Sequence, residues 1–299
     1  LSMPTDTYPT YKDTEGYQIL GRTDTAYTYL GFKLGKWNAD EGKVEYNPDS
    51  KMADKSLRQA MGYALDNDAV GTRFYNGLRS NATTLIPPVF GTLHNKDVKG
   101  YTQDIDKANK LLDDAGYKDV DGDGMREDKN GEKLTINFAS MSGGETAQPL
   151  ADYYIQQWNE IGLDVKYTTG RLIDFQAFYD KLENDDPEID VYQGAWNTGY
   201  DPSPMGLYGP NSAFNYTRFE SDENTKLLEA IDSKDSFDDT KRKEAFDAWQ
   251  EYAADEAFVI PTLYRSAVLP VSDRVTGFTW AYDADHNPWA TIAVTAESR

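Results

Sequence analysis

Alternation of apolar and polar residues with a period of two predicts the strands of this chain. The clearest alternation is in residues 27–34 (YTYLGFKL). There Tyr27, Tyr29 and Lys33 share one face, and leucine and phenylalanine side chains occupy the other. Further strands are predicted at 18–20, 133–139, 163–168, 189–195 and 258–264, with an extended segment at 268–271. Pro261 predicts an edge strand or a bulge, because proline has no N–H to donate to a neighbouring strand. Residues 37–52 are predicted to be loop.

Apolar residues spaced three and four apart predict the helices. The pattern covers 54–76 as one helix or a pair, and then 105–114, 145–161, 175–182, 223–231 and 239–255. Asp104 is suited to cap the start of the second region, and Gly116 follows its end. Strands and helices alternate between residues 133 and 195, which predicts an α/β fold with a mixed sheet flanked by helices.

The segment 189–219 begins as a strand and continues as a long loop that is unusually rich in aromatic rings. Its ring-bearing residues are Trp196, Tyr200, Tyr208, Phe214, Tyr216 and Phe219. Either the loop packs onto the protein as a lid, or its rings line a ligand cleft. The polar residues Asn197, Asp201, Asn215 and Arg218 lie among the rings, as expected for a cleft that binds an extended and partly apolar ligand.

Composition excludes several functions. The net charge of -21 disfavours nucleic acid and anionic membrane surfaces as partners, because both require a basic face. The chain contains no cysteine, which excludes disulfides, zinc–thiolate sites and a cysteine nucleophile. Its two histidines, His94 and His286, share no metal-ligand spacing. No apolar run reaches the length of a membrane span.

Residues 119–124 (DVDGDG) have the spacing of a calcium-binding loop, with Asp119, Asp121 and Asp123 as the candidate ligands. The position at which such loops carry a bidentate glutamate is Asn130, although Glu127 or Asp128 can substitute for it. The alternative interpretation is a solvated turn between a helix and a strand. A structural Ca²⁺ therefore stays open, and no cofactor is required by the sequence.

The spacing of residues along the chain does not indicate a catalytic site. The chain has no G-x-S-x-G motif, no phosphate-binding glycine loop and no carboxylate pair singled out by its position. We therefore expect a binding protein rather than an enzyme. A hydrolase and a calcium-stabilised cell-surface module remain as alternative functions.

Three segments together resemble one known family. Residues 56–70 with 75–88 (SLRQAMGYALDNDAV, YNGLRSNATTLIPP), residues 105–136, and residues 194–204 (GAWNTGYDPSP) resemble the peptide/nickel/dipeptide class of bacterial extracellular solute-binding proteins. The last segment is similar to the W-x-x-D-Y-x-D-P motif of that class, and most similar to Gram-positive oligopeptide-binding proteins. The resemblance covers nearly the whole chain, with its motifs in the family's order.

The resemblance implies the distal lobe of a periplasmic-binding-protein type II-like fold, with remnants of the second lobe. Residues 1–32 would belong to lobe I and the first crossover strand, 33–262 to the ligand-binding lobe, and 263–299 to the return into lobe I. The chain would be a C-terminal fragment that lacks the signal peptide and a lipidated cysteine. The implied protein is a monomeric, extracellular lipoprotein that delivers oligopeptides to ABC permease subunits.

The resemblance also implies where a peptide binds. Trp196 and Tyr200 match the family motif, whereas Gly199 stands where the family has an aspartate that pairs with the peptide's amino terminus. Asp201 keeps the second acidic position. We therefore expect binding through the peptide backbone and side-chain pockets. The complete set of predicted ligand-binding residues is Trp196, Asn197, Tyr200, Asp201, Phe214, Tyr29 and Tyr264.

Overall fold

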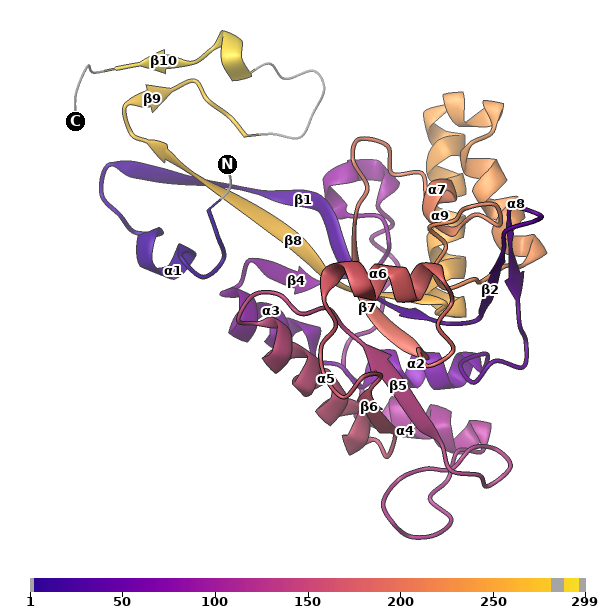
Figure 1. Ribbon diagram of the computed structural model, residues 1–299. Coiled ribbons are helices and arrows are strands. Elements are labelled where there is room, and N and C mark those ends of the chain that lie inside the picture. Colours follow the sequence, from indigo (N-terminus) through magenta and orange to yellow (C-terminus); the bar gives the residue numbers. More distant parts are fainter. Residues whose placement is uncertain (1–2, 281–287, 296–299) are drawn as a thin grey trace.

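A six-stranded mixed sheet forms the centre of the computed structural model, which describes residues 3–280 and 288–295 (Figure 1). The strand order is β4-β8-β1-β7-β5-β6. The strands are β1 (Tyr17–Phe32), β4 (Arg79–Asn81), β5 (Thr135–Ala139), β6 (Asp164–Tyr167), β7 (Val191–Asn197) and β8 (Val259–Ser272). β1 is antiparallel to β7 and β8, whereas β5 is parallel to β6 and β7. The predicted mixed α/β fold is confirmed.

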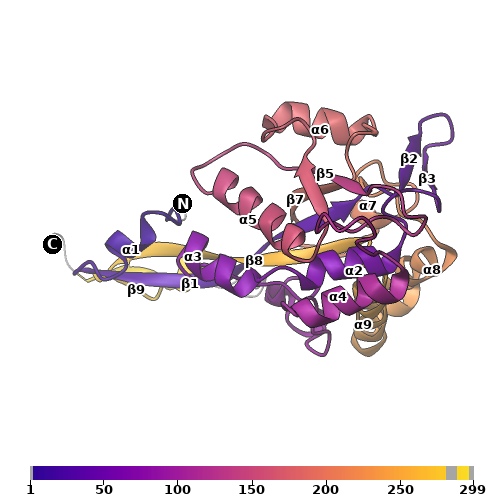
Figure 2. The ribbon, with the colours of Figure 1, turned by 90° about the horizontal axis from the view of Figure 1, so that it is seen from below.

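β1 and β8 form a long antiparallel ribbon that extends beyond the rest of the sheet (Figures 1 and 2). Near its outer end lie the short helix α1 (Tyr8–Tyr11) and the strand pair β9 (Val275–Thr276) and β10 (Ala293–Val294). The sequence predicted separate strands on each side because the polar residues 21–26 interrupt the alternation. These polar residues nevertheless continue β1, and the pairing shifts register between Thr23 and Tyr27.

Pro261 lies opposite Tyr29, directly beside a second register shift in the β1–β8 pairing. The predicted bulge is confirmed, and the alternative of an edge strand is wrong because β8 lies between β4 and β1. β8 also runs through residue 263 without interruption, so the predicted domain boundary at 262/263 falls inside a strand. The predicted return segment 263–299 includes residues 281–287 and 296–299, which lie outside the described residues.

Helices cover both faces of the sheet (Figure 2). On one face, Trp158 of α5 (Ala147–Glu160) packs edge-on against Phe138 of β5, with ring centroids 5.1 Å apart. On the opposite face, Phe178 of α6 (Phe175–Glu183) packs against Tyr192 of β7, with ring centroids 6.3 Å apart. All four side chains are buried, so both faces of the central strands belong to the core.

The predicted helices are confirmed to within about two residues at most ends. The region 54–76 divides into α2 (Lys55–Tyr63) and α3 (Asn67–Tyr75), and the others are α4 (Ile105–Ala115), α8 (Asp222–Ile231) and α9 (Asp239–Glu256). The short helix α7 (Met205–Tyr208) was not predicted and lies within the aromatic loop. Short 3₁₀ helices occur at Pro88–Leu93, Lys234–Phe237 and Pro288–Ala290. Over the described ranges, no helix has the length and apolar character to cross a membrane.

Residues 37–52 were predicted to be loop, and this prediction is wrong for residues 37–38 and 43–46, which are strand. β2 (Gly35–Asn38) and β3 (Lys43–Tyr46) form an antiparallel hairpin. Gly42 ends its turn with a φ of 62°, which glycine adopts without strain. The strands are short and only Val44 is buried, so the hydrophobic alternation was too brief to detect.

The aromatic loop after β7 is packed onto the protein and also exposes rings. Tyr208, Tyr216 and Phe219 are buried, whereas Tyr200 is 91% exposed and Phe214 is 53% exposed. Tyr208, Tyr216 and Phe219 therefore pack the loop onto the protein, whereas a ligand cleft lined by its exposed rings stays a prediction.

Candidate functional site

Four rings from three separate segments form one group, which we call the aromatic cluster: Tyr29, Trp196, Phe214 and Tyr216. Trp196 stacks with Tyr29 and with Tyr216, with interplanar angles of 9° and 14°. Phe214 meets Trp196 edge-on, with centroids 5.8 Å apart. Tyr29 and Tyr216 are buried, Trp196 is half-buried and Phe214 is exposed. The solvent exposure of the rings thus increases from the core outward, and the outermost ring offers a surface on which a ligand can stack.

Asn197 ends β7 and holds the start of the loop that follows. Its side-chain oxygen accepts hydrogen bonds from the Thr25 hydroxyl at 2.8 Å and from the Gly199 N–H at 3.0 Å. Gly199 has a φ of 67°, in the region that favours glycine. The predicted ligand-binding residue Asn197 therefore also fixes the turn that presents Tyr200.

Asp201 lies on the exposed part of this loop, next to the helices α8 and α9. Its side chain is 75% exposed, and its Oδ1 lies 3.8 Å from a guanidinium nitrogen of Arg242. The Ser203 hydroxyl donates to Asp232 at 2.8 Å and ties the loop to the end of α8. Asp201 thus presents a solvated carboxylate beside Tyr200.

The predicted residues Tyr29 and Tyr264 lie in the core. Tyr29 is 1% exposed and Tyr264 is 4% exposed. The Tyr264 hydroxyl donates to the Thr84 carbonyl at 2.8 Å and accepts from the Thr84 N–H at 2.9 Å. Burial raises the pKa of both phenols. In this structure the side chains of both tyrosines contact other protein side chains, and the Tyr29 ring stacks against Trp196.

A buried ion cluster lies next to the aromatic cluster, and the sequence reading did not find it. We use this name for Lys33, Asp185 and Arg218. Asp185 Oδ1 accepts from Lys33 Nζ at 2.5 Å and from Arg218 Nε at 2.7 Å. Asp185 Oδ2 accepts from the Trp37 N–H at 2.6 Å. The available signal was Lys33, the only charged residue in the predicted strand 27–34.

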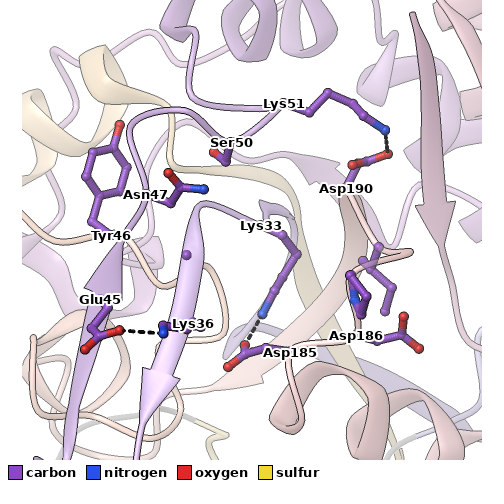
Figure 3. Close-up of a pocket in the computed structure, with 13 residues that line it drawn as sticks. Lys33, Lys36, Glu45, Tyr46, Asn47, Ser50, Lys51, Asp185, Asp186 and Asp190 are labelled. Carbon is purple, nitrogen blue, oxygen red and sulfur yellow. Dashed lines mark hydrogen bonds and ion pairs between the residues drawn. The ribbon is translucent and has the colours of Figure 1, made fainter.

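Lys33 and Asp185 of the ion cluster line a cavity of about 530 Å³, together with residues of β2, β3 and the loop after α6 (Figure 3). Lys33 points toward Asp185, and Lys51 points toward Asp190 at 2.7 Å (Figure 3). Burial lowers the pKa of Lys33 to about 8, against the opposing effect of Asp185. Arg218 is 1% exposed, as is Asn215, so neither of these predicted polar contacts faces a ligand.

The acidic loop brings three carboxylates together, although not the three that were predicted. Ligand atoms of Asp119, Asp121 and Glu127 lie within 4.8 Å of one another, whereas Asp123 is outside the group. Asp119 accepts hydrogen bonds from the N–H groups of Gly122 at 2.7 Å and Gly124 at 3.0 Å. The loop is therefore closed by its own backbone, and the calcium site stays a prediction.

Comparison with known proteins identifies related sequences along the whole chain. Residues 1–218 match the family described as bacterial extracellular solute-binding proteins, family 5 Middle. The oligopeptide-binding protein OppA of Lactococcus lactis subsp. lactis (strain IL1403) is 36% identical over 293 residues, which cover 97% of this chain and 48% of OppA. The chain therefore spans about half the length of the curated relatives it matches.

Solved structures agree with the sequence match. Lactococcal OppA complexed with an endogenous peptide in the closed conformation superimposes with a TM-score of 0.87 at 36% identity, covering 98% of this chain and 54% of that chain. AppA from Bacillus subtilis in complex with a nonapeptide gives a TM-score of 0.75 at 19% identity, covering 94% of this chain and 53% of that chain. The second similarity concerns the fold alone.

Proposed function

The chain belongs to family 5 of the bacterial extracellular solute-binding proteins, and from this premise we propose that it captures extracellular oligopeptides for an ABC importer. The observation that carries the proposal is the graded aromatic cluster in a chain 36% identical to a peptide-binding relative. The family is one of binding proteins rather than enzymes, and we propose that no catalytic step occurs. The relatives favour neither a calcium-stabilised surface module nor a hydrolase.

We propose that the chain contributes one lobe of a two-lobed protein, with β1 and β8 as the strands that link the lobes. Support comes from the β1–β8 ribbon, which extends beyond the sheet, and from relatives about twice as long. Hinge closure would then bury a peptide between the lobes, and the closed state would be the one that a permease recognises. We further propose a monomer held at the outer face of the cytoplasmic membrane by a lipid anchor.

The proposed ligand surface consists of Trp196, Phe214 and Tyr200, with Asn197 and Asp201 at its rim. Exposed rings give contact area to many different side chains, and hydrogen bonds to the peptide backbone are independent of peptide sequence. Such a surface suits a protein that accepts varied peptides. Tyr29 and Tyr264 act from the core by supporting Trp196 and the loop at Thr84.

A binding assay on the complete protein that contains this chain tests the proposal. We expect a peptide library to change tryptophan fluorescence, and expect oligosaccharides and metal chelates to leave it unchanged. Phe214→Ala should weaken peptide binding about tenfold, because a stacking ring at a binding surface contributes on the order of 1–2 kcal/mol. The matched control is Phe175→Ala on α6, which removes another exposed ring. If oligosaccharides or metal chelates change the tryptophan fluorescence and peptides do not, the peptide assignment is contradicted.

A further inference from the structure

The buried ion cluster is bonded directly to the backbone that carries the aromatic cluster. Lys33 Nζ donates to the Tyr216 carbonyl at 3.0 Å. Arg218 donates to the carbonyls of Ala213 at 3.0 Å and Asn215 at 3.2 Å, on either side of Phe214. We propose that the ion cluster positions Phe214 and Tyr216 for the ligand, with Lys33 as a positioning residue of the binding site. The inference rests on the proposed function.

A second set of bonds connects the same loop to the end of α6. Arg218 donates to the Glu183 carbonyl at 3.2 Å, and the Tyr216 hydroxyl donates to the Glu183 carboxylate at 3.2 Å. Asp185 follows α6 and binds both cations of the cluster. Tyr216 is therefore held at its carbonyl by Lys33 and at its hydroxyl by Glu183, which leaves its ring a fixed support for Trp196.

Backbone strain indicates that this arrangement is maintained by the ion cluster. Asp185 and Arg218 have φ values of 52° and 58°, in the left-handed region that non-glycine residues rarely adopt. The two residues that carry this strain are bonded to each other at 2.7 Å. Strained backbone persists only where surrounding interactions determine it, and it concentrates at functional sites. The ion pair joins the two turns to each other.

Of the three residues in the ion cluster, Lys33 is the one whose charge can be removed while the protein stays folded. The cluster holds two cations and one carboxylate, so Arg218 and Asp185 remain a balanced pair when Lys33 is lost. Other charged groups around the cavity are paired among themselves: Lys36 with Glu45, Lys51 with Asp190, and Lys181 with Asp186. The phenols of Tyr192 and Tyr216 stay neutral because burial raises the pKa of each.

The test compares Lys33→Met and Lys33→Arg in the complete protein, with an N-acetylated peptide library as the ligand so that the peptide's own amino group does not titrate. At pH 7, Lys33→Met should bind about fivefold more weakly, because a charge-assisted bond to the loop is lost. Lys33→Arg should restore binding. Between pH 7 and 9.5 the unaltered protein should lose a similar factor as Lys33 loses its proton, whereas Lys33→Arg should not.

A ligand-free readout keeps this inference separate from the proposed function. The acrylamide quenching assigned to Trp196, by subtraction of Trp196→Phe, should increase in Lys33→Met and not in Lys33→Arg. Lys51→Met is the matched control, because Lys51 lines the same cavity and bonds Asp190 rather than the aromatic loop. Unchanged quenching and affinity in Lys33→Met would overturn the inference while peptide binding by the unaltered protein stands. Increased quenching supports it even if peptides fail to bind.

Discussion

Tyr192 lies across Gly31 of the neighbouring strand, and a Cβ atom at residue 31 would stand 2.2 Å from Cζ of the Tyr192 ring. The same relationship occurs with the strands exchanged two pairs further along, where a Cβ at Gly194 would stand 2.7 Å from the Tyr29 ring. Each glycine is the cross-strand partner of the tyrosine that covers it. Two bulky rings thus fit on adjacent strands, and the second of them, Tyr29, supports Trp196.

We expect Gly31→Ala to destabilise the protein by about 1–3 kcal/mol, the usual cost of overpacking a buried site. Tyr192 is 1% exposed, and its ring packs against those of Tyr29 and Phe178, so moving it away from residue 31 would disturb the core. Chemical denaturation of this chain measures the effect. Gly143→Ala is the control, because no atom lies within 4 Å of a Cβ at that exposed glycine. Equal stability of the two variants would contradict the packing explanation.

Local patterns were sufficient to predict most of the fold. Helix α4 is an example, because the signals that define it lie close together in the sequence. They are its apolar stripe, its N-terminal cap at Asp104 and its left-handed C-terminal residue Gly116. β1 was divided in the prediction because its polar middle has no apolar face, and only the pairing with β8 reveals it as one strand. Pairing between distant strands is not encoded in a local window.

The candidate site was predicted in part for the same reason. Trp196 and Phe214 were found because rings in a turn-rich loop are conspicuous. The ion cluster joins residues 33, 185 and 218, whose proximity depends on the complete fold. Arg218 was taken for a ligand contact because the sequence does not show that its charge is already paired with Asp185.

Asp185→Asn should destabilise the protein by about 3–5 kcal/mol, because it leaves two buried cations without a counter-charge. Asparagine keeps the shape of the side chain and tolerates the φ of 52°, so the variant isolates the charge. The neighbouring Asp186→Asn is the control. Asp186 pairs with the more exposed Lys181, and we expect a loss of at most about 1 kcal/mol. Thermal melts of both variants provide the comparison, and similar losses would contradict it.

The stability of the protein should rise relative to Lys33→Met as the pH increases from 7 to 10. Burial lowers the pKa of Lys33 to about 8, below the value of about 10.4 in an unfolded chain. Over this range the unfolded state binds more protons at Lys33, so raising the pH favours the folded state. The gain should be about 2–3 kcal/mol, measured as the difference in unfolding free energy between the two proteins. A difference independent of pH would show that Lys33 titrates normally.

Amino-terminal acetylation of the peptide should change its Kd by less than about threefold. By the resemblance to the family motif, Gly199 stands where an acid is expected. The Asp201 carboxylate is 75% exposed, where an ion pair contributes about 1 kcal/mol or less. Calorimetry with matched free and acetylated peptides measures the effect in the complete protein. A tenfold loss on acetylation that disappears in Asp201→Asn would instead assign recognition of the peptide amino group to Asp201.

Calcium should stabilise the acidic loop without being required for folding. The backbone N–H groups of Gly122 and Gly124 already close the loop onto Asp119, so we expect a chelator to leave the melting temperature unchanged. Asp121 and Glu127 lie close enough to Asp119 to share a cation. With a Kd of about 1 mM, typical of extracellular calcium modules, 10 mM Ca²⁺ would add about 1.4 kcal/mol. This corresponds to a rise of roughly 3–6 °C in the melting temperature.

The calcium effect can be assigned to the loop by two substitutions of the same kind. Asp121→Asn removes one carboxylate of the group and should abolish the rise in melting temperature. Asp13→Asn, at an exposed position distant in sequence, should leave the rise intact and so controls for the general effect of divalent ions on an acidic protein of net charge -21. If the melting temperature stays constant at 10 mM Ca²⁺, the loop is a solvated turn whose carboxylates serve only its own backbone.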